Sequence, residues 1–179
     1  MNPVVQSVVD SAVGATAAAA GWVMALHGDR LSVIAAFGAA DLVGTDVSAD
    51  AGTAGFVVNS GQPMAMAARQ GDARLSEGVL GLLAERPESV LCVPCTSADG
   101  VVGVLELVDK ADGVTFSFDD VELATLLAGI AAAAIEADEG GVAVRSPDEL
   151  GAELRRLAAA DPAGYAQVAT LVEAILARG

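Results

Sequence analysis

Aromatic residues are scarce in this chain of 179 residues: Phe, Trp and Tyr make up 3% of it, although hydrophobic residues make up 54%. Smaller apolar side chains must therefore supply the core, and the chain is long enough to bury one. Basic residues are scarce too, with nine Lys and Arg against 24 Asp and Glu, which gives a formal net charge of −15. Because a field of that sign repels nucleic acids and anionic membrane surfaces, we expect neither as a partner.

Cysteine and histidine are equally rare, with two cysteines and one histidine in the whole chain. Two thiols cannot build a disulfide framework and suit a reducing compartment, and so few ligands lead us to expect no metal site. Cys92 and Cys95 match the letters of a redox C-x-x-C motif. Because they lie three apart on a predicted strand, we favour buried packing on opposite faces over thiol chemistry. His27 adjoins a predicted turn, and we favour an exposed turn residue over a haem or metal ligand.

No segment has the composition of a membrane span, although the mean hydropathy is +0.55. The uncharged run Ser11–Gly28 has 18 residues but is rich in alanine, and its transfer into lipid is only weakly favourable. No Lys or Arg precedes Arg30, so the run lacks the basic flank of a signal peptide. We expect a soluble, cytoplasmic protein.

Hydrophobic periodicity and turn residues predict the order of helices and strands. A helix begins at an Asn2–Pro3 cap and fades near Gly21. A hairpin follows over 22–26 and 31–37, with its turn at Gly28–Asp29. The remaining predicted elements are a helix over 53–60, a strand over 64–67, a short helix ending before Pro87, strands over 90–95 and 101–108, and a long helix over 118–138.

The start of the long helix carries complete capping signals. Ser117 is the expected N-cap with Asp120 as the acidic half of a capping box, and Phe116 and Val121 occupy the positions of a hydrophobic staple. The apolar stripe that we expect to face the core is Leu123, Leu126, Leu127, Ile130, Ala134 and Ile135.

Two further helices are predicted near the C-terminus, each opened by a proline. They begin at Ser146–Pro147 and Asp161–Pro162, after a break at Gly140–Gly141. We therefore expect one domain over 1–139, followed by a linker and a C-terminal helical hairpin over 140–179. The apolar faces of the hairpin must pack on the domain, on a second copy or on a partner.

The element order and several short motifs resemble the GAF domain family, over roughly Val4–Glu136. The motifs are Gly52-Thr53-Ala54-Gly55 with Ser60-Gly61-Gln62-Pro63, then 89–94 and 103–108. The resemblance implies an α+β fold with a central antiparallel sheet of five or six strands. It places the terminal helices on one face of the sheet, with pocket-closing loops and short helices on the other. It also implies a regulatory module that binds a small ligand and dimerises through its terminal helices.

One subgroup of the family binds cyclic nucleotides and carries an Asn-Lys…Phe…Asp-Glu motif. The corresponding residues here are Asp109–Lys110, Phe116 and Asp119–Asp120, with altered identities and shorter spacing. We expect Lys110 to pair with Asp119 or Asp120 as a structural latch. The departures, together with few polar residues on the expected pocket wall, favour a ligand that is small and partly apolar over a nucleotide.

The resemblance also selects a set of candidate ligand-binding residues. Glu106 faces either the pocket or solvent on an alternating strand, and the residues alone leave both open. We expect no catalytic and no metal-binding residues, and the cofactor is unknown. The predicted ligand-binding residues are Trp22, Phe37, Thr53, Ala54 and Glu106.

From these observations we expect a non-enzymatic sensor domain in signal transduction. It would bind an unidentified small molecule, form a homodimer and act on a separate partner chain. One alternative is a ligand-free dimerisation and docking scaffold, whose C-terminal hairpin binds a signalling protein. Another is a thiol-dependent reductase of free methionine sulfoxide, an activity found in some stand-alone members of the family, although the cysteine spacing of those members is missing here.

Overall fold

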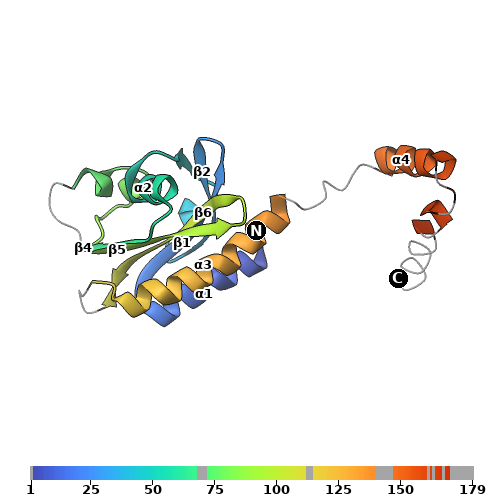
Figure 1. The fold of residues 1–179 in the computed structure, drawn as a ribbon. Coiled ribbons are helices and arrows are strands. Elements are labelled where there is room, and N and C mark those ends of the chain that lie inside the picture. Colours follow the sequence, from blue (N-terminus) through green and yellow to red (C-terminus); the bar gives the residue numbers. More distant parts are fainter. Residues whose placement is uncertain are drawn as a thin grey trace. The chain divides into compact units, whose positions relative to one another are not determined.

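The computed structural model describes residues 2–67, 72–111, 115–139 and 147–160, together with 162, 164–166 and 168–169. The chain divides into two compact units, Met1–Glu139 and Gly140–Gly179. The first unit is built on one six-stranded sheet in the order β3-β2-β1-β6-β5-β4, with antiparallel pairing throughout (Figure 1). The predicted α+β fold is confirmed. The strands are β1 Ala18–His27, β2 Arg30–Phe37, β3 Asp46–Ser48, β4 Met64–Ala67, β5 Ser89–Ser97 and β6 Gly100–Lys110.

The helices form a layer on each side of this sheet. Helices α1 (Pro3–Thr16) and α3 (Phe118–Glu139) lie side by side on one face (Figure 1). Helix α2 (Gly52–Ser60) lies against β5 and β6 on the other face, with short 3₁₀ turns at Ala40–Leu42, Ala73–Ser76 and Leu80–Leu82. Each face therefore buries its own apolar cluster, one under α1 and α3 and one under α2.

The first helix ends earlier than its alanine content predicts. It begins as predicted, with the Asn2 side chain accepting hydrogen bonds from the N–H groups of Val4 and Val5. It ends at Thr16, because Ala17 adopts a left-handed conformation and Ala18 joins β1, where it pairs with Lys110 of β6. Pairing in the centre of the sheet outweighs the helix propensity of the alanine run.

Helix α3 presents alanine, and not leucine, to the core. Ala124, Ala128, Ala131 and Ala132 are buried there together with Ile135, whereas Leu126 is 72% exposed and Ile130 is 51% exposed. The prediction that Leu126 and Ile130 face the core was therefore wrong. The helix approaches the sheet so closely that a Cβ added to Gly103 of β6 would lie 3.0 Å from Ile135 Cδ1. Small side chains permit that approach, and the large ones are displaced to the outer surface.

The second unit contains α4 (Pro147–Ala160), and residues 162, 164–166 and 168–169 are also helical. These helical residues fall where the two arms of the C-terminal hairpin are predicted, while the remaining residues of that hairpin lie outside the described part of the chain. Within the described residues, no helix is long and apolar enough to cross a membrane.

Candidate ligand-binding site

A buried carboxylate lies at the centre of the sheet, on the face covered by α2. Glu106 of β6 pairs in register with Trp22 of β1 on one side and with Cys92 of β5 on the other. These three residues therefore stand in one row across three strands, and all three are fully buried. Thr53 of α2 contacts Glu106 from the helix layer above the sheet, and its side chain is buried as well. Of the two orientations that the sequence left open for Glu106, the structure has the one directed away from solvent.

The Glu106 carboxylate is held entirely by neutral donors. Trp22 Nε1–H donates to Oε2 at 2.9 Å, and the Thr53 hydroxyl donates to Oε1. The Cys92 thiol provides a third hydrogen bond. Burial raises the pKa of Glu106 to about 7, although the three hydrogen bonds act in the opposite direction. The group is therefore close to the balance between its neutral and charged forms at physiological pH. We refer to Trp22, Thr53, Cys92 and Glu106 as the Glu106 cluster.

The start of α2 explains how Thr53 reaches the carboxylate. Gly52 has a φ of +67°, and a Cβ there would lie 2.9 Å from the backbone oxygen of Glu77. A Cβ on Gly55 would lie 2.3 Å from the carbonyl carbon of Asp50. Both glycines of the Gly52-Thr53-Ala54-Gly55 motif thus allow the helix to seat closely against neighbouring backbone. This seating brings Thr53 over Glu106.

The surroundings of the Glu106 cluster are tightly filled by apolar side chains. Met24, Val57, Leu80 and Val104 pack in the same apolar cluster, as does Ala54. Among the described residues, every buried side-chain nitrogen and oxygen has a hydrogen-bond partner. The Glu106 cluster is therefore surrounded by apolar side chains, and its polar side-chain atoms are paired within the protein.

The structure brings together four of the five predicted ligand-binding residues. Trp22, Thr53, Ala54 and Glu106 share the apolar cluster or hydrogen bonds under α2. Phe37 does not join them: it is 45% exposed, and its neighbour Ala36 is the residue that packs into this cluster. Successive residues of a strand face opposite sides of the sheet. Phe37 therefore does not line a common pocket wall with Trp22. The ligand-binding role of all five residues stays a prediction.

Sequence reasoning did not include Cys92 in the site, although the register now places it beside Glu106. As predicted, the two cysteines face opposite sides of the sheet, since Cys92 belongs to the cluster under α2 and Cys95 to the one under α1 and α3. Burial raises the pKa of Cys95 to about 12. Burial, together with the nearby Glu106, also raises the pKa of Cys92 well above its ordinary value. The sequence places Cys92 and Glu106 on two neighbouring predicted strands. Their pairing could be predicted only from the register of the hairpin, which the sequence does not fix.

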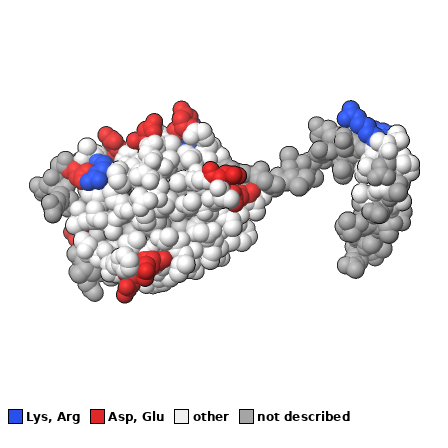
Figure 2. Space-filling model, viewed as in Figure 1, with Lys and Arg blue, Asp and Glu red and all other residues white. Residues whose placement is uncertain are grey.

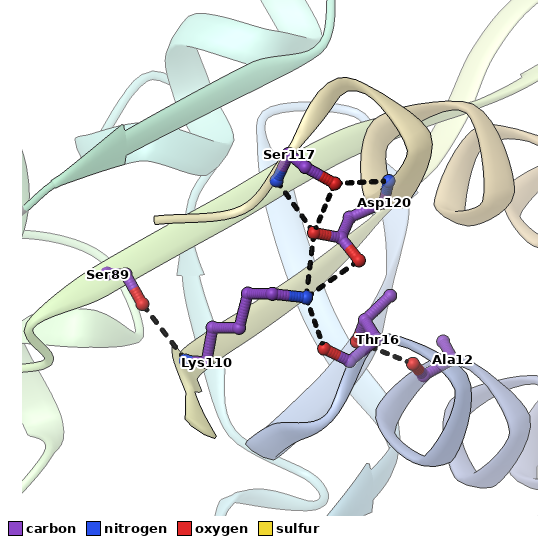
Figure 3. Close-up of polar contacts among 6 residues, drawn as sticks. All are labelled: Ala12, Thr16, Ser89, Lys110, Ser117 and Asp120. Carbon is purple, nitrogen blue, oxygen red and sulfur yellow. Dashed lines mark hydrogen bonds and ion pairs between the residues drawn. The ribbon is translucent and has the colours of Figure 1, made fainter. Parts of the chain in front are cut away.

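A separate polar clamp joins β6 to both terminal helices (Figure 3). Lys110 Nζ donates to the Thr16 carbonyl oxygen at 2.8 Å and to Asp120 Oδ1 at 2.8 Å, so the predicted latch forms with Asp120. Ser117 N–H donates to Asp120 Oδ2 at 2.6 Å, which completes the predicted capping box. Burial alone would raise the pKa of Asp120, but the hydrogen bonds from Lys110 and Ser117 outweigh it and the pKa is lowered. The clamp is structural and lies apart from the Glu106 cluster.

Comparison with known proteins identifies the family of this chain. The family model described as GAF domain covers residues 2–136, and the chain therefore belongs to the GAF domain family. Domains of this family are commonly sensory or regulatory ligand-binding modules. No curated protein sequence matches the chain significantly.

Several solved structures share the fold. The chain is similar to the GAF domain of an Acinetobacter phosphoenolpyruvate-protein phosphotransferase, with 21% identity, 77% of this chain and 82% of that chain covered, and a TM-score of 0.66. It is also similar to the GAF-B domain of DevS from Mycobacterium smegmatis, with 20% identity and a TM-score of 0.61. That match covers 77% of this chain and 94% of that chain. A third similar structure is a type II free methionine-R-sulfoxide reductase from Thermoplasma acidophilum, with 14% identity and a TM-score of 0.58. That match covers 73% of this chain and 89% of that chain. At these identities the similarity shows the fold alone.

Proposed function

We propose that this protein is a regulatory GAF domain that binds a small, partly apolar molecule at the Glu106 cluster and signals as a homodimer. The observation that carries the ligand proposal is the buried Glu106 carboxylate, whose partners Trp22, Thr53 and Cys92 are all neutral. Burying an ionisable group without a cation costs stability, and a hydrophobic residue would fill the same space at lower cost. Such a costly group is therefore a candidate for recognition.

The chemistry of the cluster limits the ligand. A carboxyl group poised near neutral pH accepts hydrogen bonds from N–H or O–H donors, and the apolar side chains around it favour a ligand with a hydrophobic body. Thr53 of α2 covers the Glu106 carboxylate. A ligand can therefore reach the carboxylate only if α2 moves and a donor of the ligand replaces the Thr53 hydroxyl. Trp22 remains on the sheet and continues to orient the carboxylate.

A thermal-shift screen over nucleotides, amino acids and aromatic acids tests the ligand proposal. A ligand at a hundred times its Kd should stabilise the domain by about 2.7 kcal/mol. The Glu106→Gln variant should lose most of that gain, whereas Glu122→Gln on the exposed side of α3 removes the same charge and should keep it. Hits that stabilise Glu106→Gln as strongly as the wild type would place the ligand elsewhere.

The homodimer proposal rests on the outer surface of α3. Leu126 and Ile130 are largely exposed there, and Gly129 lies between them with open space around it. Val4 of the neighbouring helix α1 is 48% exposed. Large exposed side chains beside a small residue suit close packing of two helices from two copies. Sedimentation at micromolar concentration should detect dimers, and a monomer alone would contradict this part of the proposal.

The partner proposal concerns the second unit. Amphipathic α4 carries Leu154 and Leu157 on one side and Arg155 and Arg156 beside them, which suits docking to another protein. The charge of −15 argues against a nucleic acid as that partner, and the red side chains distributed over the face in Figure 2 agree with this. The two free thiols suit a cytoplasmic location. Removal of 140–179 should abolish partner capture and leave the stability of the first unit unchanged.

A ligand-free dimerisation scaffold is the second candidate, and the hydrogen bonds that Glu106 already makes within the protein favour it. Met24, Leu80 and Trp22 are buried in the apolar cluster under α2. If the screen yields no stabilising compound while the dimer is confirmed, the scaffold is preferred. A thiol reductase is disfavoured, because both thiols are buried and their raised pKa values suppress the nucleophilic thiolate. If the wild type reduced methionine sulfoxide and Cys92→Ala did not, the reductase would become the preferred hypothesis.

A further inference from the structure

A cavity that is separate from the Glu106 cluster opens at one end of the sheet. It has a volume of about 300 Å³ and lies where the end of β1 meets the start of α1 and the end of α3. His27 and Gly44 contribute to its wall, and none of the five predicted ligand-binding residues lines it. Its volume is at the lower limit of ligand pockets in proteins, which suits a molecule with a single ring or a branched chain.

The interior of this cavity is apolar because of local features of the sheet. Its lining includes Ala25, Ile34, Val43 and Ile135. The register between β1 and β2 shifts at this place, since Val23 pairs with Ala35 and Met24 with Val33, which leaves Ile34 as the extra residue of a bulge. Bulges redirect side chains and occur frequently beside functional sites. The small side chain of Ala25 leaves the adjacent volume unfilled.

The polar side of the cavity is formed by Asn2, His27 and Asp138, of which Asp138 is the acidic residue. Asp138 of α3 lines it, and the Asn2 amide donates to Asp138 Oδ2 at 2.9 Å, which fixes the carboxylate in place. The end of α3 bears the negative end of the helix dipole, and its last turn contains no basic residue. With a net charge of −15 on the whole chain, this environment attracts a cation and repels an anion.

We infer that this cavity is a second ligand site, which binds a small organic ammonium ion with its hydrophobic body on Ile34, Val43 and Ile135 and its charged group at Asp138. The proposal needs no residue of the Glu106 cluster, although Val33 and Val43 of the cavity wall also pack in the apolar cluster under α2. The protein would then bind an amine through residues other than the Glu106 cluster.

Benzylamine is a suitable probe, with benzyl alcohol and benzoate as its neutral and anionic counterparts. A titration of the full chain, followed by ¹H–¹⁵N NMR near neutral pH, should shift the amide signals of Ala25, Ile34 and Gly44. Benzylamine should bind most tightly and benzoate least, with weak affinities as expected for so small a probe. Equal affinity for benzylamine and benzoate, or shifts centred on Thr53 and Trp22, would overturn the inference.

Two variants separate the charged and apolar contributions. Asp138→Asn keeps the acceptor for Asn2 and should weaken benzylamine about two- to fivefold, the range of exposed ion pairs, with benzyl alcohol unchanged. Glu122→Gln removes the same charge about 24 Å away along α3 and should weaken benzylamine much less. Val43→Trp fills the cavity and should abolish both probes while the NMR spectrum remains that of a folded protein. If either Asp138→Asn or Val43→Trp left the affinity for benzylamine unchanged, the proposed site would be refuted.

Discussion

The buried Glu106 carboxylate should make the stability of the domain depend on pH in a defined direction. Its pKa is about 7 in the folded protein, against an ordinary value of 4.5 that applies to the unfolded chain. The folded state therefore holds the proton more tightly, so stability is highest below about pH 4.5 as far as this group is concerned. It declines as the pH rises from there to about 7, and levels off above.

The size of the effect follows from the two pKa values. Their difference, at about 1.4 kcal/mol per pH unit, corresponds to about 3 kcal/mol of stability lost across this range. The neighbouring Cys92 stays protonated throughout, because its own pKa is raised well above the ordinary thiol value. A loss of this size is a large fraction of the stability of a typical domain.

Glu106→Gln removes the titration and preserves the shape of the side chain. The amide oxygen still accepts from Trp22 Nε1–H, and the amide N–H₂ can donate to the Thr53 hydroxyl, which turns to accept. At about pH 8 the variant should therefore be as stable as the wild type or more stable, with the difference closing or reversing at about pH 5. The general repulsion among 24 acidic residues also varies with pH, so the exposed Glu122→Gln variant is the matched control.

Urea unfolding followed by tryptophan fluorescence is a direct assay, because Trp22 is the single tryptophan and donates to Glu106 itself. The free energy of unfolding is measured for the wild type and both variants between about pH 5 and about pH 8. The wild type should lose about 3 kcal/mol relative to Glu106→Gln over this range, while Glu122→Gln follows the wild type. Parallel profiles for the wild type and Glu106→Gln would refute the conclusion that the carboxyl is buried and titrates near neutrality.

Three further outcomes test other parts of the structure. Lys110→Met should lower the free energy of unfolding by about 1–3 kcal/mol, since Asp120 and the Thr16 carbonyl lose their shared donor. Gly103→Ala should destabilise by about 1–3 kcal/mol, because the new Cβ would lie 2.3 Å from the Met24 carbonyl oxygen, whereas Gly14→Ala, in open space on α1, should stabilise by about 0.5–1 kcal/mol. Leu126→Glu should convert the expected dimer into a folded monomer in sedimentation, with a melting temperature that no longer depends on protein concentration, and a persisting dimer would exclude this surface.

The parts of the fold that the sequence predicted are those governed by local signals. The cap at Asn2, the capping box of Ser117 and Asp120, and the turn at Gly28–Asp29 each depend on a few neighbouring residues, and each forms as predicted. The opposite faces of Cys92 and Cys95 follow from strand alternation alone.

The errors arose where packing at a distance decides the outcome. Ala18 enters the sheet because β6 is available to pair with it, and no local signal reveals that partner. Leu126 and Ile130 lie outside because the close approach of α3 to the sheet admits only alanine beneath it. Phe37 lies away from the Glu106 cluster because a bulge at Ile34 alters the alternation of β2. For Leu126, Ile130 and Phe37 the hydrophobic pattern alone indicated a different face.

Strand β6 connects the features on which the proposals depend. It carries Glu106 under α2 and, four residues later, Lys110, which binds the end of α1 and the start of α3. A ligand that displaces Thr53 from Glu106 would therefore act on the same strand that anchors both terminal helices. By thermodynamic linkage, any such ligand that tightens the dimer must itself bind the dimer more tightly, by the same factor. A ligand affinity that is independent of protein concentration across the dimerisation range would show that β6 supports the two faces without coupling them.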